Sequence, residues 1–490
     1  MTQVVTCLVQ FLETMKTRIA FLIGGSLLLS LAAPETPASA ADSKLVLHEW
    51  GTFTSLQDES GRSVGGINTD DEPVPHFVHQ LDPQLLLSPN DIRNRFDKGA
   101  PHGHPDATMR LETPVIYFHL PQGGSIRTLD VEVGFRGGWL TEFYPHARAA
   151  APGIEGDRRR FGLYRFGPIT PKTFGSLQWN GLQVGGNWGL TNTSDRVWTA
   201  PRAVDASLVR ATNNEAEKFL FYRGIGNLDA PLRVSRDLPS GQLVIRGQFD
   251  LPSCNRLAIS KLWLVDIRPD GNLAYRVIPG FDAQPHSTRF LGRTAGSFPE
   301  KDYSAGNLRR LRRDLRRALV ADGLFADEAD SLLNTWQLSY FKSEGMRLFF
   351  LVPREWTDHV LPLKISEPAQ VTRVMVGRIE LVTSTQQKLL ATIASYSPAT
   401  VASASSMLAA NFNRTLMASP HSYAMMARGS GSMASHFKVP AEYQAYLDLG
   451  RFRNALVLHA AQHPATAPIT NFIFAFRLSG YDPTLAGQPQ

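Results

Sequence analysis

The sequence predicts a mixed fold, in which an N-terminal antiparallel, sandwich-like β-rich domain is followed by an α+β region. Apolar and polar residues alternate over 129–135, which is the period-2 pattern of a half-buried strand. The segment Pro269-Asp270-Gly271 separates two apolar runs and is typical of a hairpin turn. Beyond residue 300 the pattern changes, and leucines recur at helical spacing at positions 308, 311, 315 and 319.

These patterns place a β-rich domain over residues 41–298 and an α+β region over 299–490. In the first part we expect strands at 115–118, 129–135 and 219–222, and a hairpin over 262–277. In the second part we expect helices over 307–321 and 325–340, a helix that begins near Ser384 or Thr385, and helical structure over 442–461. Residues 400–437 are rich in Ala, Ser, Gly and Met, and this composition predicts a flexible segment. Alternating phenylalanines at 472, 474 and 476 predict a closing strand over 471–478.

The composition excludes several classes of protein. Of the 490 residues, 43% are hydrophobic and 19% are charged, so the chain can bury a sizeable core and is not a disordered sequence. Two cysteines exclude a disulfide scaffold, a four-cysteine zinc site and a cysteine-ligated iron–sulfur cluster. The sequence lacks HExxH, GxSxG, a P-loop and a GxGxxG turn, which argues against the common zincins, α/β-hydrolases, NTPases and dinucleotide enzymes.

The N-terminus predicts export. Met15-Lys16-Thr17-Arg18 is followed by an apolar run over 19–33 and by the small-residue sequence Ala38-Ser39-Ala40. This order is that of a signal peptide, with translation starting at Met15 and cleavage before Ala41. The apolar run is shorter than the ~20 residues of a membrane-spanning helix. We therefore expect residues 1–40 to be removed, a mature chain without a transmembrane segment, and a periplasmic or extracellular location.

Histidines are concentrated in the N-terminal half, where seven of the 13 lie between positions 48 and 146. They are His48, His76, His79, His102, His104, His119 and His146. Carboxylates accompany them, and imidazole with carboxylate is a ligand set that suits zinc, manganese or iron. A helical turn beginning at Pro75 would project His76 and His79 from one face. The pattern predicts a divalent metal such as zinc bound by Asp70, Asp71, His76 and His79, with Glu72 as the catalytic base.

Four more residues are candidates for this site, namely His48, Glu49, His102 and His104. Glu49 lies in the segment 48–54, which a buried first strand explains as well as chemistry does. The glycines and prolines around His102 and His104 predict a loop. The competing interpretation is that all these histidines are surface or turn residues and that the carboxylates cap turns.

Two functions remain open at this point. The first is an exported soluble protein with a metal-dependent hydrolytic or small-ligand-binding site. The second is a non-catalytic envelope protein that binds a polysaccharide or another protein through tryptophan-bearing loops and an arginine-rich helix over 309–317. The net charge of +6 permits attraction to anionic envelope polymers, whereas export argues against a nucleic-acid partner.

Overall fold

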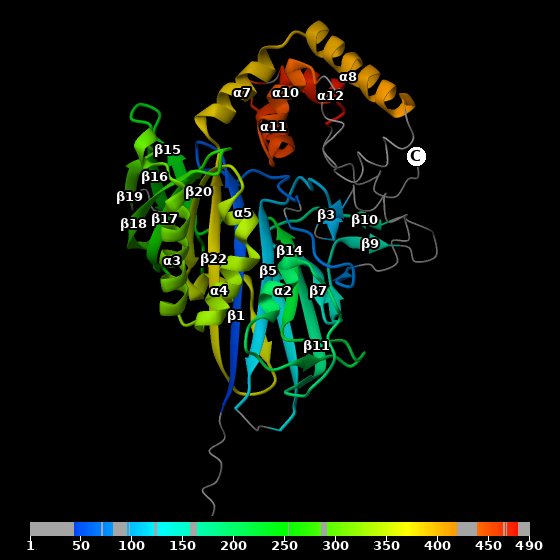
Figure 1. Cartoon of the computed structure of the whole chain (residues 1–490), viewed down its shortest axis with the longest axis vertical. Helices are drawn as coiled ribbons and strands as arrows, with labels where there is room; N and C mark the ends of the chain where they lie inside the picture. The colour runs from blue at the N-terminus through cyan, green and yellow to red at the C-terminus, as the bar shows by residue number, and fades with distance from the viewer. Residues whose placement is uncertain are drawn as a thin grey trace, which may run out of the picture. The chain divides into compact units, whose positions relative to one another are not determined.

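The computed structural model describes residues 44–69, 72–81, 96–97, 99–121, 125–156, 164–252, 254–285, 292–418, 439–463, 466 and 468–478. The predicted signal segment, residues 1–40, lies outside the described residues. From Lys44 onward the chain forms one compact unit, shown in Figure 1. The fold is mixed and sheet-rich, with one large sheet and several helices, as the sequence predicts.

In the described residues the large sheet has 15 strands, most of them in antiparallel pairs. Its main path runs through β13 (Ala216–Glu217), β12 (Val209–Arg210), β11 (Phe174–Val184), β7 (Gly138–Tyr144), β14 (Leu220–Gly226), β5 (Met109–His119), β1 (Leu45–Gln57), β22 (Ala369–Leu381), β20 (Gly345–Val352), β17 (Leu257–Ile267) and β18 (Leu273–Ala283). Outside this path, β2 (His79–Gln80) pairs with β7, β6 (Arg127–Arg136) and β8 (Arg148–Ala150) pair with β11, and β21 (Leu363–Ile365) pairs with β6. Smaller sheets join β9 (Ile154–Gly156) to β10 (Tyr164–Phe166), β3 (Phe96–Asp97) to β4 (Ala100–Pro101), and β15 (Leu232–Arg236) and β19 (Gly292–Ala295) to β16 (Gln242–Gly247).

The described helices are α2 (Arg196–Arg202), η1 (Glu300–Asp302), α3 (Ala305–Ala321), α4 (Ala326–Thr335), α5 (Gln337–Phe341), α6 (Arg354–Val360), α7 (Ser384–Ser395), α8 (Pro398–Ala418), α10 (Ala441–Leu447), α11 (Arg453–Ala461) and α12 (Ile469–Ala475). None of the helices in this part of the chain has both the length and the hydropathy of a membrane-spanning segment.

The middle of the large sheet joins segments that are far apart in the sequence. Strand β1 pairs antiparallel with β5 and parallel with β22, so residues 45–57 lie beside residues 369–381. Strand β20 then connects β22 to β17. The boundary expected at residue 298 is therefore not visible as a break in this sheet, and the pairings do not confirm a sandwich or the order of two domains.

Helices α2 to α5 cover one face of the central strands (Figure 1). Leu311, Leu315 and Leu319 of α3 are buried and share an apolar cluster with Trp50 of β1. The Ser304 side chain caps this helix by accepting a hydrogen bond from the Gly306 N–H. The opposite face of β1 and β5 belongs to another apolar cluster, which also contains side chains of β6, β11 and β15.

Several local predictions are confirmed. Strands β17 and β18 form the expected hairpin, and Gly271 has the positive φ that its turn requires, 80°. Helix α3 spans the predicted leucine pattern, and α7 begins at Ser384 behind a capping box of Thr383 and Gln386. The single helix expected over 325–340 is interrupted at Trp336 and forms α4 and α5.

Two local predictions differ from the structure. Residues 398–418 form α8, although the flexible segment was expected to begin at residue 400. Residues 419–438 lie outside the described residues.

The prediction of a closing strand over 471–478 is wrong, because residues 469–475 form α12. Phe472 is buried and packs on Phe476 with ring centroids 4.6 Å apart, whereas Phe474 is 87% exposed. Residues four apart share a helix face, so three alternating phenylalanines also fit a helix.

Candidate functional site

The site is built on two neighbouring strands. His48 lies on β1 opposite Tyr117 of β5, and His119 ends β5 opposite Val46. Side chains two residues apart on a strand point to the same face, so His48 and His119 project together. Their ring centroids are 5.3 Å apart in an edge-to-face arrangement.

Helix α4 supplies the third side chain from its first turn. The Glu328 carboxylate accepts hydrogen bonds from His48 Nδ1 at 2.7 Å and from His119 Nε2 at 2.9 Å. It also accepts the Phe325 N–H at 2.8 Å, which caps the helix. A carboxylate in the first turn of a helix is favoured by the helix dipole as well. Glu328 therefore joins α4 to both strands.

The Glu328 carboxylate is ionised at neutral pH despite its burial. Burial by itself would raise the pKa of Glu328, but the hydrogen bonds from His119 and His48 outweigh that effect and hold the pKa at about 2. The side chain is completely buried, and His48 is almost completely buried. The site is thus an anionic oxygen ligand enclosed between two imidazoles.

Phe325 covers the two histidines. Its ring centroid lies 4.5 Å from that of His48 and 4.9 Å from that of His119. The Phe325 side chain is itself 47% exposed. The Phe325 ring therefore shields this cluster from solvent in part, and His119 remains 13% exposed.

The geometry of this group fits a metal ion. One ligand atom each from His48, His119 and Glu328 lies within 4.8 Å of the others. Two imidazoles and one carboxylate are a ligand set of catalytic zinc sites, in which a water molecule or a substrate completes a tetrahedron. The alternative is that Glu328 serves only as a hydrogen-bond acceptor that fixes α4 to the sheet.

A second group, made of Asp58, His459 and His463, also brings three ligand atoms within 4.8 Å. Here the carboxylate accepts hydrogen bonds from the backbone and hydroxyl of Ser60 and from the backbone and side chain of Arg62. The Arg62 guanidinium also contacts His463 Nε2 at 2.8 Å. The Arg62 guanidinium already provides the positive charge next to Asp58 and His463. We therefore assign the group of Asp58, His459 and His463 a structural role.

The metal site predicted over residues 70–79 includes Glu72 and His79, and these two side chains pair with different partners, Arg196 and Glu215. Asp70 and Asp71 lie outside the described residues. Glu72 is buried, forms an ion pair with Arg196 and accepts the Ser339 N–H. Burial raises its pKa, and Arg196 partly offsets this effect.

The Pro75 carbonyl accepts the Val78 N–H and closes a turn that contains His76 and precedes His79. His76 is exposed and its ring contacts Phe77. His79 begins β2, and its Nε2 lies 2.8 Å from each oxygen of Glu215. The metal site predicted there remains a prediction.

The other candidates lie in three different environments. His48 belongs to the His48–His119–Glu328 group described above, and His102 is exposed. His104 is buried between the Gly167 carbonyl, to which Nε2 donates, and the Asp106 N–H, which Nδ1 accepts. Burial lowers the pKa of His104, as expected for a neutral imidazole that packs in a core.

Glu49 is fixed in the protein core by its contacts with Arg373 and Tyr222. It is completely buried, forms an ion pair with Arg373 and accepts the Tyr222 hydroxyl. Its side chain points to the face opposite to that of His48, because neighbouring residues alternate on a strand. His48 is a candidate predicted from the sequence that lies in a histidine–carboxylate group, whereas its partners His119 and Glu328 are not among the residues predicted for the site. Alternation on 115–119 could have indicated His119, but no local signal links it to Glu328, which is 209 residues away.

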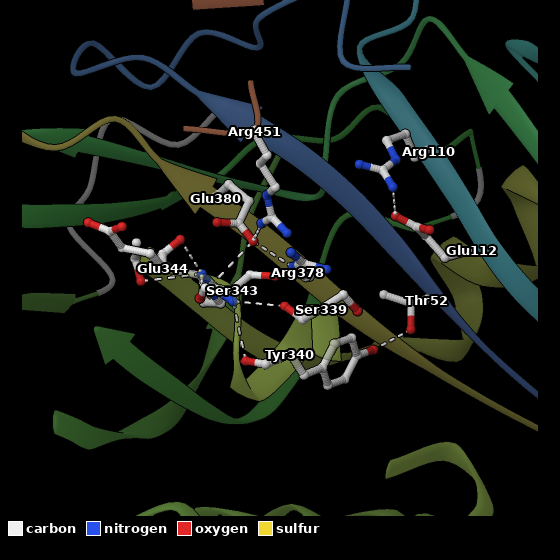
Figure 2. A network of polar contacts seen from close by, with 12 residues as sticks. Thr52, Arg110, Glu112, Ser339, Tyr340, Ser343, Glu344, Arg378, Glu380 and Arg451 are labelled. Carbon is white, nitrogen blue, oxygen red and sulfur yellow. Dashed lines mark hydrogen bonds and ion pairs between the residues drawn. The ribbon is translucent and has the colours of Figure 1, made fainter. Parts of the chain in front are cut away.

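Figure 2 shows another buried polar network, around Glu380 of β22. Its carboxylate forms ion pairs with Arg347, Arg378 and Arg451. Burial would raise the pKa of Glu380, but the three guanidiniums hold it at about 2. Arg347 also donates to the backbone carbonyls of Ser339 and Ser343. Guanidinium groups are not metal ligands, so we do not assign a metal to this network. The ion pair of Arg451 with Glu380 links the segment before α11 to β22.

The tryptophans and arginines of the second hypothesis are distributed unevenly. Trp139, Trp179 and Trp198 are buried, and Trp188 is half-buried with the Arg210 guanidinium 4.8 Å from its ring. On α3, Arg312 and Arg316 contact Asn334 and Asp330, whereas Arg309, Arg310, Arg313 and Arg317 are exposed.

No protein-family model matches this sequence, and no curated protein matches it. Among solved structures, the chain is similar to the yeast delta-COP-I mu-homology domain, at 8% identity and with a TM-score of 0.23 over 69% of this chain and 96% of that chain. The same domain in complex with a Dsl1 WxWxV peptide gives the same values. At this TM-score the likeness supports no statement about function.

Proposed function

We propose that this protein is an exported metalloprotein that binds one divalent transition metal, zinc in the first place, through His48, His119 and Glu328. The observation that supports the proposal is the convergence of these three ligand atoms within 4.8 Å. Three protein ligands leave one position for water or a small ligand, and zinc lowers the pKa of bound water enough for hydrolysis at neutral pH. A hydrolase or a small-ligand-binding protein would use the same centre.

The ligand charges support a 2+ ion. Glu328 contributes one negative charge in a buried environment, and an ion there would be desolvated and strongly attracted to it. Phe325 would limit access of water to the metal, because its ring covers both imidazoles. The first-turn position of Glu328 fixes the carboxylate on a rigid element before the metal binds.

The proposal is tested by measuring metal in chelator-free protein and by titrating zinc into EDTA-treated protein. We expect one zinc per chain. His119→Gln and Glu328→Gln should weaken zinc binding by more than the ~10–100-fold that substitution of an outer-shell residue costs. His79→Ala is the matched control, since His79 is also held by a carboxylate but lies outside the group, and it should retain one zinc.

If a variant fails to fold, its zinc affinity says nothing about the site, so a second measurement uses the unmodified protein. Co²⁺ added to the unmodified protein should give the visible absorption bands of a tetrahedral nitrogen–oxygen site. If the unmodified protein neither contains nor takes up a stoichiometric metal, the group is only a hydrogen-bonded link between α4 and the sheet. If His79→Ala loses the metal and His119→Gln keeps it, the metal lies in the segment predicted from sequence, with Asp70, Asp71 and His76.

The four exposed arginines of α3 favour a second candidate function, in which the protein attaches to an anionic envelope polymer. A face that carries Arg309, Arg310, Arg313 and Arg317 attracts polyanions in a salt-dependent manner. Substituting these four arginines with glutamine should abolish retention on an anionic polysaccharide column at low salt. Substituting Arg312 and Arg316, which contact α4, should leave retention unchanged.

A further inference from the structure

A cavity of about 600 Å³ lies away from the histidine–carboxylate group. Its walls come from the turn after β1, the β6–β7 turn, the segment that follows β14, the segment that follows β16, and helix α6. Known small-molecule sites have volumes of about 300–1,000 Å³, carry a few converging polar groups and lie where several elements meet. This cavity has all three properties.

The polar lining contains side chains of both charges. Arg136 and Arg233 supply guanidinium groups, and Asp229 and Asp250 supply carboxylates. Arg62 adds a third guanidinium, which is already paired with Asp58 and contacts His463. A strongly anionic ligand would be repelled by the two aspartates, and a cationic ligand by the three arginines. A neutral ligand with many hydrogen-bond donors and acceptors satisfies both sets.

The contacts of these side chains leave them able to bind such a ligand. Arg136 donates through Nε to the His359 carbonyl, and Arg233 donates twice to the Ser60 carbonyl, so both are oriented by backbone oxygen atoms. Asp229 is oriented by the Ser63 hydroxyl at 2.6 Å. Guanidinium and carboxylate groups held in this way recognise pairs of neighbouring hydroxyl groups, since the first donates and the second accepts.

Neutral groups complete the lining. The Gln248 side-chain oxygen is buried and accepts no hydrogen bond from any described residue. A buried acceptor without a donor is costly, and a hydroxyl group in the cavity would supply the donor after rotation of the amide. Burial and the nearby Arg136 lower the pKa of His359, although Asp250 opposes the effect, so its imidazole is neutral at neutral pH. Phe249 and Trp356 add apolar surface.

From these observations we infer that the cavity is a binding site for a neutral saccharide unit. The mixed charges, the neutral imidazole and the unsatisfied amide oxygen match a ring that carries several hydroxyl groups. The inference does not rest on the proposed metal centre, and saccharide binding should be the same in metal-loaded and EDTA-treated protein.

Saturation-transfer NMR on the full chain tests the inference. The probes are a panel of neutral mono- and disaccharides, the uronate counterpart of each monosaccharide, and cyclohexanol as a six-membered ring with one hydroxyl group. At least one neutral saccharide should bind, more tightly than its uronate and than cyclohexanol. Asp250→Asn and Arg136→Gln should each weaken this binding by about tenfold, which is the loss of one charge-assisted hydrogen bond.

Matched controls come from an exposed ion pair outside the cavity, Arg256 with Asp282. Arg256→Gln and Asp282→Asn should leave saccharide binding unchanged. The inference is overturned if no neutral saccharide binds, if uronates or cyclohexanol bind equally well, or if the control variants weaken binding as much as the cavity variants do.

Discussion

At the scale of single residues, Glu328 and Glu380 are two buried carboxylates with the same pKa, about 2, and different partners. Glu328 is held by imidazoles, whose nitrogen atoms are able to ligate a metal when they release their proton. Glu380 is held by guanidiniums, which remain protonated and have no lone pair to offer. The partner therefore decides which of the two carboxylates belongs to the candidate metal centre.

Glu380 allows a prediction on stability. Glu380→Gln leaves Arg347, Arg378 and Arg451 around an uncharged amide, and we expect the free energy of unfolding to fall by about 3–5 kcal/mol. Urea titration followed by circular dichroism measures the change. Glu300→Gln is the matched control, because Glu300 pairs with Arg268 at the exposed surface, where water screens the pair, and its loss should change the free energy of unfolding far less than Glu380→Gln does. Equal effects of both substitutions would contradict a structural role of the network.

The lowered pKa of Glu380 makes the free energy of unfolding depend on pH. The folded pKa of Glu380, about 2, lies below the ordinary value of 4.5 that applies to the unfolded chain. The contribution of Glu380 is therefore fully present above pH 4.5 and is lost as the pH falls from 4.5 to about 2. In stability curves over this range, Glu380→Gln should flatten the acid decline relative to the unmodified protein, whereas Glu300→Gln should leave most of it.

At the scale of elements, α12 shows how a short pattern admits two structures. Helix α12 packs against α7, α8 and α11 in the C-terminal apolar cluster, where Phe472 is buried. The hydrogen bond from the Phe476 N–H to the Phe472 carbonyl closes its last turn. The contact that selects the helix is thus tertiary, since the alternating phenylalanines alone fit a strand equally well.

Phenylalanine substitutions distinguish the two structures. Phe472→Ala should lower the free energy of unfolding by about 3–5 kcal/mol, because it removes a fully buried ring. Phe474→Ala should change it by no more than ~0.5 kcal/mol, because that side chain is 87% exposed. Thermal unfolding of both variants measures the difference. In a strand, both phenylalanines would lie on one face, and equal costs would contradict the helix.

At the scale of the whole molecule, strands from both halves of the sequence form one sheet. The parallel pairing of β1 with β22 places His48 beside Thr372, and α3, α4 and α5 arise from the chain between β18 and β20. The candidate metal centre depends on this arrangement, because β1 and β5 supply the histidines and α4 supplies the carboxylate.

The predicted export signal determines which residue should begin the mature chain. Protein recovered from the host envelope should begin at or near Ala41, because the predicted signal ends at Ala40. Cys7 lies before the predicted cleavage point and also before the predicted start at Met15, so the denatured mature chain should titrate as a single thiol, Cys254. N-terminal sequencing and thiol titration check the two statements. A mature chain that retains residues 19–33, or one with two thiols, would contradict export by this signal.

The sequence by itself determined the local elements of this protein. The hairpin at Gly271, the leucine face of α3 and the Thr383 cap of α7 are set by residues within a few positions of one another, and chain connectivity keeps such residues close in any fold. Only the tertiary structure decided that Glu328 reaches His48 across 280 residues and that Phe472 is buried in a helix. The physical reason is that such contacts depend on strand register and on helix packing, which are selected by the burial of the whole apolar surface and leave no signal in any short segment.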